Sequence, residues 1–295
     1  MKKLIVVALV AAGCSPMTVT VDAGSGGGLS GAGGGAASAG GTASAGGAAS
    51  AGGTASAGGS AGPTRIGSVT LSQSSLEVAG QPFRSGMVLA NFFEIPSQFT
   101  GCTTSTIGAC RLSNCAAAAD AGTPPDGGMV SAGDLTITGL ADGGVTLMPG
   151  GMGYQKVISG PIFVAGGPIG VSAAGATVPA FTAQVNAPTG ATLTAPVCTQ
   201  STCPAISKAT GLTVSWTGGV GTVSIEVIAG ADEISCEYPA AAGTATIPAA
   251  TLAQLPTGTA SLFFNTLNAT TVQAGLFPVK VTASEAKLFQ TSIAP

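Results

Sequence analysis

The sequence predicts an all-β protein with two antiparallel β-sandwich (Ig-like) domains after a disordered N-terminal tether. From residue 65 onward, apolar and polar residues alternate in segments of four to eight residues, which is the periodicity of half-buried strands. Gly, Pro, Asn and Asp separate these segments at intervals typical of sandwiches. Only 7% of the 295 residues are charged, so we expect the outer sheet faces to consist mostly of Thr, Ser, Gly and Ala.

The first fourteen residues have the form of an export signal. Two lysines are followed by a short apolar run, residues 4–10, and by small residues that end at Cys14. The apolar run is too short to span a bilayer, which takes about 20 residues. The small residues before the cysteine resemble the lipobox of bacterial lipoproteins, which implies removal of residues 1–13 and acylation of Cys14, with palmitate among the acyl chains. The alternative is an ordinary secretory signal with a chance cysteine.

Residues 14–63 are predicted to be a flexible, lipid-anchored tether. From residue 36 to 59 they repeat Gly, Ala, Ser and Thr with a period of six, and no charge lies between Asp22 and Arg65. Two glycines in every six residues each disfavour helix by about 1 kcal/mol relative to alanine. The repeat offers no large aliphatic residue to bury, so it cannot offset its ordering entropy. O-glycosylation of its Ser and Thr residues remains an alternative role.

The first sandwich domain is expected over residues 64–187. Its clearest feature is a hairpin of residues 135–138 and 145–147, because Asp142-Gly143 is a strong turn signal. Further strands are predicted for residues 68–72, 75–78, 86–93, 158–164, 169–173 and 181–185. Residues 95–133 form a long insertion with few strand signals. Its three cysteines suggest that disulfides pin it.

The second sandwich domain is expected over residues 188–295, after a boundary at residues 186–190. Strands are predicted for residues 212–216, 223–228, 234–238, 244–247, 261–267 and 278–282. Pro248 suits the first turn of a short helix over residues 249–255. Trp216 alternates in phase with Leu212 and Val214, so we expect it to lie in the core and not on a binding surface.

Six cysteines remain besides the predicted lipid anchor, an even number that suits disulfides in an exported protein. They are Cys102, Cys110, Cys115, Cys198, Cys203 and Cys236. Three fall in each predicted domain, so full pairing requires at least one bridge between the domains. Cys198 and Cys203 flank a short loop and are expected to pair locally, in preference to binding zinc. Cys236 then needs a partner from the insertion; we expect Cys115, with Cys102 and Cys110 as the remaining pair.

The chain contains no histidine, which removes Ser–His–Asp and Cys–His catalysis and the commonest metal ligand. Residues 58–62 match G-x-S-x-G and residues 284–287 match S-x-x-K. Both matches lack their accompanying features, so we interpret them as chance. We expect no cofactor and no metal. A net charge of −3 argues against nucleic acid as a partner.

The strongest set of candidate catalytic or binding residues consists of four carboxylates, Glu226, Asp232, Glu233 and Glu237. If residues 223–228 and 234–238 form a hairpin, Glu226 and Glu237 share an outward face. Paired carboxylates there could perform acid–base chemistry or hold Ca²⁺, but solvated surface charge is the preferred interpretation. A second acidic set matches no calcium loop; it comprises Asp120, Asp126, Asp134 and Asp142.

The chain as a whole resembles lipoproteins common in myxobacteria, with a lipobox, a Gly/Ala/Ser tether and cysteine-bearing β domains. Local resemblance lies at residues 132–138 and 246–250. The resemblance implies a location, with the lipid on Cys14 as the membrane anchor. Ser15, in place of the Asp that retains enteric lipoproteins at the inner membrane, implies the outer membrane by analogy.

Three classes of function follow from these observations. We expect a non-enzymatic protein of the cell surface with a structural or adhesive role, whose partner is a surface protein or a glycan. One alternative is a ligand-binding module for a glycan or Ca²⁺. The other is a hydrolase that uses Glu226 and Glu237.

Overall fold

The protein is described by a computed structural model over residues 64–295, except residues 79–80, 96–102, 115–127, 152 and 200. Almost all of this part is β-structure, as the sequence predicts. Among the described residues, the helical segments are the 3-10 turn η1 (Ala240–Ala242) and the single turn α1 (Ala249–Leu252). The predicted signal and tether, residues 1–13 and 14–63, lie outside the described residues.

One ten-stranded sheet runs through the whole described molecule. In spatial order its strands are β3 (Thr103–Ile107), β4 (Cys110–Asn114), β14 (Asp232–Pro239), β13 (Thr222–Ala229), β16 (Gly258–Ala274), β17 (Phe277–Ala294), β1 (Thr64–Val78), β2 (Gln81–Ile95) and β7 (Tyr154–Ser159). The tenth, β11 (Ile206–Ser207), pairs with the end of β17. Strands β1 and β17 pair in parallel, and most other neighbours are antiparallel.

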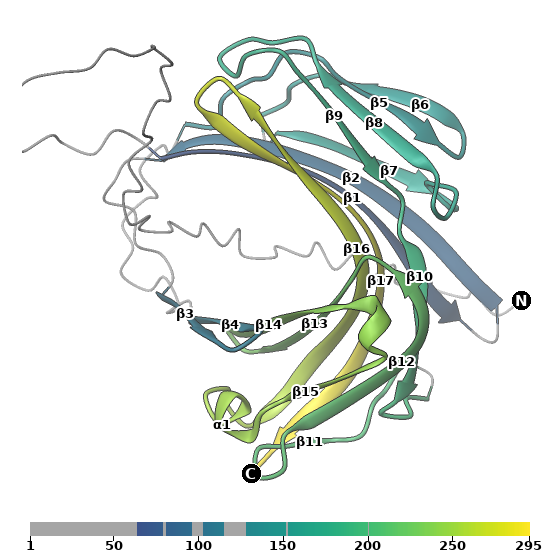
Figure 1. Cartoon of the computed structure of the whole chain (residues 1–295), viewed down its shortest axis with the longest axis vertical. Coiled ribbons are helices and arrows are strands. Elements are labelled where there is room, and N and C mark those ends of the chain that lie inside the picture. The colour runs from purple at the N-terminus through teal and green to yellow at the C-terminus, as the bar shows by residue number, and fades with distance from the viewer. Residues whose placement is uncertain (1–63, 79–80, 96–102, 115–127, 152, 200) are drawn as a thin grey trace, which may run out of the picture.

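Two smaller antiparallel sheets complete the sandwiches. The four-stranded sheet is formed by β6 (Gly143–Leu147), β5 (Leu135–Leu140), β8 (Pro168–Ala173) and β9 (Phe181–Asn186). The three-stranded sheet is formed by β10 (Thr189–Ala195), β12 (Leu212–Val220) and β15 (Thr244–Ile247). Figure 1 shows them at the upper right and lower right, along the curved strands of the ten-stranded sheet.

Both hydrophobic cores lie on the same face of the ten-stranded sheet. The first core packs β1, β2 and β17 against the four-stranded sheet, with Phe92 and Ile137 among its fully buried side chains. The second packs β13, β14 and β16 against the three-stranded sheet, with Ile225 and Ile247 fully buried. The register of β13, β16, β17 and β1 places the apolar residues of both cores on one side. The opposite side, here called the inner face, is therefore shared by both sandwiches.

The hairpin β16–β17 extends through both sandwiches. Phe264 near its middle lies in the second core, whereas Val272 and Val279 at its tip pack in the first. The sequence predicts strands only for residues 261–267 and 278–282 of this hairpin. The alternation of small polar and apolar residues continues beyond these predicted ranges. Strand β16 is therefore 17 residues long and β17 is 18 residues long. Residues 272–283, assigned by sequence to the second domain, therefore contribute to the first core.

Most predicted strands are present, with differences at their ends. The segments predicted at residues 68–72 and 75–78 are one strand, β1, and the segment predicted at 158–164 is shifted to β7. The boundary predicted at residues 186–190 contains the start of β10. Residues 249–255 form only the single turn α1, with Pro248 at its N-cap position. The differences at the strand ends arise where pairing with a neighbouring strand, and not local alternation, sets the limits.

The cysteine-bearing insertion contains a hairpin that sequence analysis missed. Strands β3 and β4 join through a turn at Gly108, whose φ of 62° favours glycine, and β4 pairs with β14 of the other sandwich. Cys110 lies directly opposite Cys236 in this pairing, and the two form a disulfide. The bridge between the two halves is thus confirmed. The expected partner Cys115 is wrong, and so is the pair Cys102–Cys110.

The remaining cysteine prediction concerns the short loop before β11. Cys198 and Cys203 form the expected local disulfide. Cys102 and Cys115 lie outside the described residues.

Candidate functional site

A cluster of polar side chains occupies the inner face at the β4 end of the ten-stranded sheet. On β13 and β14, Glu226 lies opposite Ser235 and Ser224 lies opposite Glu237. Because directly paired residues share a face, the predicted pairing of Glu226 and Glu237 on one face is confirmed. Asp232 has the opposite parity along β14, so it does not join them; its carboxylate accepts a hydrogen bond of 3.2 Å from Asn114 Nδ2.

Glu226 is the most enclosed carboxylate of this cluster. Its Oε1 accepts hydrogen bonds from Ser224 Oγ at 3.1 Å and from Asn265 Nδ2 at 3.0 Å. Ser224 is 1% exposed and Asn265 9% exposed, so both donors are held within the sheet. Glu226 is half-buried between its neighbours β14 and β16, so the predicted interpretation as fully solvated charge on an open face is wrong for this residue.

Asn265 has a second polar atom that finds no hydrogen-bond partner among the described residues. Its Nδ2 is engaged by Glu226, and its Oδ1 is buried. A buried amide oxygen without a donor is unfavourable, by about 1–3 kcal/mol in proteins. This oxygen is therefore a place where a bound group with an N–H or O–H donor would be stabilised.

Burial and mutual repulsion disfavour negative charge at this site. Burial raises the pKa of Glu226, and the carboxylates of Glu233 and Glu237 raise it further, against the hydrogen bonds from its two donors. Burial also raises the pKa of Glu233, while the nearby positive charge of Arg111 lowers it. The site therefore holds carboxyl groups that would gain from a neighbouring positive charge.

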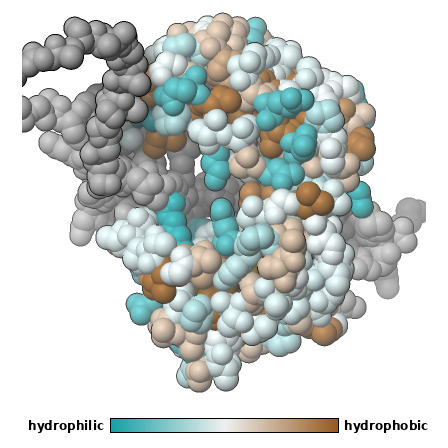
Figure 2. Space-filling view, viewed as in Figure 1, coloured by the Kyte–Doolittle hydropathy of each residue, from teal (hydrophilic) through white to brown (hydrophobic). Residues whose placement is uncertain are grey.

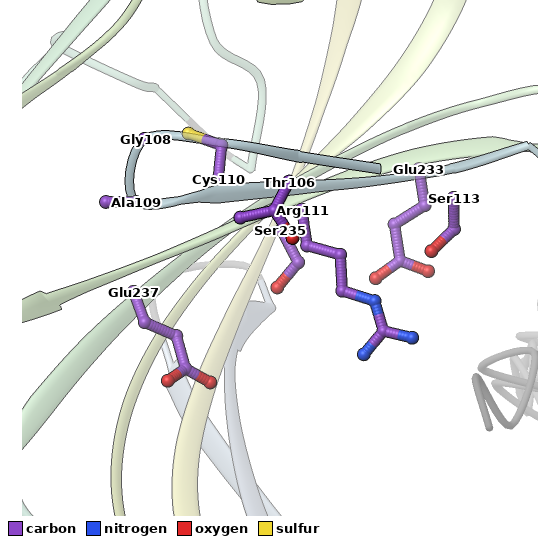
Figure 3. A pocket seen from close by; sticks show the side chains of 9 residues that line it. All are labelled: Thr106, Gly108, Ala109, Cys110, Arg111, Ser113, Glu233, Ser235 and Glu237. Atoms are coloured by element: carbon purple, nitrogen blue, oxygen red, sulfur yellow. The ribbon is translucent and has the colours of Figure 1, made fainter. Parts of the chain in front are cut away.

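A hollow of about 350 Å³ is lined by Glu233 and Glu237, on the strand next to that of Glu226. Figure 3 shows Glu233, Glu237 and Arg111 projecting from the strands to the same side. Hydroxyl groups complete the lining, from Thr106, Ser113 and Ser235. Figure 2 shows hydrophilic residues around the recess between the upper and lower parts of the molecule.

Replacing Glu226 by Gln is expected to stabilise the protein at high pH but not at low pH. A carboxyl whose pKa is raised in the folded state stabilises it below the ordinary value, 4.5, and loses this contribution as pH rises through the folded pKa. Gln keeps the accepting oxygen and has no charge to bury. Thermal unfolding between pH 4 and pH 8 should show a difference that grows with pH. The exposed Asp142→Asn serves as control, and a pH-independent difference would contradict the assignment.

Sequence analysis predicted only the carboxylates of this cluster and missed its other members, among them Arg111, Ser113 and Asn265. Arg111 and Ser113 come from the unpredicted strand β4, and Asn265 from β16, two strands away from β14. A signal for β4 was present, since Thr/Ser-rich residues 103–107 and residues 110–114 flank a Gly-Ala pair. Nothing in the sequence indicates that this hairpin pairs with β14.

The other candidate residues are not brought together. Asp134 and Asp142 are exposed, whereas Asp120, Asp126, Cys14 and residues 58–62 lie outside the described part. Ser284 and Lys287 of the S-x-x-K match have opposite parity on β17, and Lys287 Nζ donates to the carbonyl of Ala191 at 3.2 Å. Their placement on opposite sheet faces agrees with a chance match.

Within the described residues, no group of three or more Cys, Asp or Glu side chains converges as metal ligands would. The helices of the described part are all too short to cross a bilayer.

No protein-family model matches the chain, and no curated protein shows significant similarity to it.

Proposed function

We propose that the protein is a lipid-anchored surface protein of the bacterial cell envelope with a non-enzymatic structural or adhesive role. The signal and cysteine at residues 1–14 support export and anchoring at the outer membrane. Two disulfides in the described part suit an oxidising compartment outside the cytoplasm.

The observation that best supports an interaction role is the continuous sheet shared by both sandwiches. Strand β4 joins β14 and a disulfide fastens the two, while β16–β17 contributes to both cores. Such a body presents surfaces in fixed orientation to a partner. Its outer faces carry paired hydroxyls such as Thr213–Thr246 at 3.1 Å and Thr136–Thr146 at 3.3 Å, as a surface protein of low charge requires.

Replacing Cys14 by Ala is expected to abolish anchoring. One acyl chain gives only marginal membrane binding and several give a stable anchor, so loss of the acylated residue should release the protein. Labelling cells with a palmitate analogue and fractionating them measures both effects, with most of the parent in the membrane fraction. The double variant Cys198→Ala/Cys203→Ala should keep the label. A Cys14→Ala variant that stays labelled and membrane-bound would refute the lipid anchor.

A second candidate function is ligand binding at the inner face, favoured by the half-buried Glu226 and by the hollow lined by Glu233, Ser235 and Glu237 on the adjacent strand. Glu226 and Glu237 are also the residues that a hydrolase would use. The two roles predict different results, because a hydrolase converts an oligosaccharide to shorter products and a binding module leaves it intact. Chromatography of an incubated oligosaccharide separates them.

A further inference from the structure

We propose that the inner-face cluster binds an amino sugar. The carboxylates of Glu226 and Glu237 would take the ammonium group, and the Ser, Thr and Asn side chains beside them would take the sugar hydroxyls. This inference rests on the ligand-binding role proposed above and names its ligand class.

The charges of the cluster favour a cationic ligand. Among the described residues, three carboxylates, Glu226, Glu233 and Glu237, share the site with one guanidinium, that of Arg111. The positive charge of Arg111 acts on Glu233, and the contributions to Glu226 from neighbouring charges are both repulsive. A cation between Glu226 and Glu237 would relieve this repulsion at a partly desolvated position, where attraction is stronger than in water.

The spacing of the carboxylates favours an organic ammonium group over a metal ion. Within the described part, no three acidic or cysteine side chains group as the ligands of a metal ion would. Glu226 on β13 and Glu237 on β14 are diagonal neighbours on the same face of the sheet. Their two carboxylates can therefore contact one bound group from two different sides. An ammonium group carries three hydrogen-bond donors and can reach both carboxylates without their converging on one point.

The remaining polar groups favour a ligand with hydroxyls. Thr106, Ser113 and Ser235 place hydroxyls in the hollow, and the buried Oδ1 of Asn265 lacks a donor among the described residues. A sugar hydroxyl supplies both a donor and an acceptor, so it can satisfy each of these groups. Phe263, partly exposed and opposite Glu226 on β16, offers an aromatic surface beside the carboxylates.

Isothermal titration of the full chain with three probes tests the proposal. The probes are the glucosamine trisaccharide, which has amines and hydroxyls, the N-acetylglucosamine trisaccharide, which lacks the amines, and putrescine, which lacks the hydroxyls. We expect the glucosamine trisaccharide to bind at least tenfold more tightly than either of the others. Replacing the exposed Glu237 by Gln should weaken this binding at least tenfold, whereas Asp142→Asn, an exposed acid in the β5–β6 turn, should leave it unchanged.

Each other result overturns a stated part of the proposal. Equal binding of the acetylated trisaccharide excludes the ammonium group as the determinant, and equal binding of putrescine excludes the sugar. Binding that Glu237→Gln does not weaken places the ligand elsewhere, and absence of binding refutes the site. Anchoring is measured separately by fractionation of Cys14→Ala cells, so a failed titration leaves the proposed envelope location to its own test.

Discussion

Replacing Cys110 and Cys236 together by Ala is expected to lower the free energy of unfolding by up to about 5 kcal/mol. In the chain-entropy model a bridge stabilises by restricting the unfolded chain, and the restriction grows with the length of the closed loop. These cysteines are 126 residues apart, so their bridge restricts almost half of the chain. Alanine avoids placing a hydroxyl in the buried position of Cys236, which is 0% exposed.

The second disulfide provides a matched control. Cys198 and Cys203 are only 5 residues apart, for which the same model gives about 2 kcal/mol. Urea unfolding of the two double-alanine variants should therefore give a clearly larger loss for Cys110/Cys236. Equal losses would mean that the long bridge does not act through the unfolded chain. Non-reducing peptide mapping of the parent checks the pairing itself, and a Cys115–Cys236 peptide would contradict the structure.

The long bridge also shows where sequence reasoning reached its limit. Counting cysteines was enough to require a link between the halves, because an odd number on each side cannot be closed internally. The choice of partner needed the register of β4 on β14, which places Cys110 opposite Cys236. Pairing between strands more than 100 residues apart leaves no local trace in the alternation of side chains.

Local sequence patterns correctly predicted the structural features that are determined by residues close together in the chain. The hairpin of β5 and β6, the inward alternation of β12 and the shared face of Glu226 and Glu237 all follow from turn residues and a period of two. The surroundings of Glu226 could not be predicted in the same way. Asn265 reaches it only because β16 pairs with β13, and Arg111 joins the site only because β4 extends the sheet beyond β14.

Replacing Trp216 by Ala is expected to cost about 3–5 kcal/mol of stability, the usual range for removing a large buried aromatic side chain. Trp216 is 3% exposed, as its alternation on β12 predicted. Its indole Nε1 donates a hydrogen bond of 2.7 Å to the carbonyl of Ala240, and its ring lies 6.1 Å from that of Phe264. The variant therefore loses apolar contacts and the shorter of the two hydrogen bonds to the Ala240 carbonyl, which also accepts one of 3.3 Å from the Gly243 N–H.

Two further variants separate these contributions. Trp216→Phe keeps an aromatic ring but loses the indole donor, while the Ala240 carbonyl keeps the Gly243 N–H, so losing this hydrogen bond should cost about 0.5–1.5 kcal/mol. The neighbouring Thr217 is exposed, and Thr217→Ala should change stability by less than about 0.5 kcal/mol. Because Trp216 is the only tryptophan, unfolding of all variants is followed by circular dichroism. A Phe variant less stable than the Ala variant would contradict this account of the site.

The same measurement tests whether the two sandwiches unfold together. Phe264, which contacts Trp216, lies on β16, and the far end of that strand packs Val272 against the first core. Loosening the second core should therefore weaken the first, because neither strand of the β16–β17 hairpin belongs to one sandwich alone. We expect Trp216→Ala to shift a single cooperative transition to lower temperature. Two transitions, with the upper one unchanged from the parent, would mean that the shared hairpin does not couple the cores.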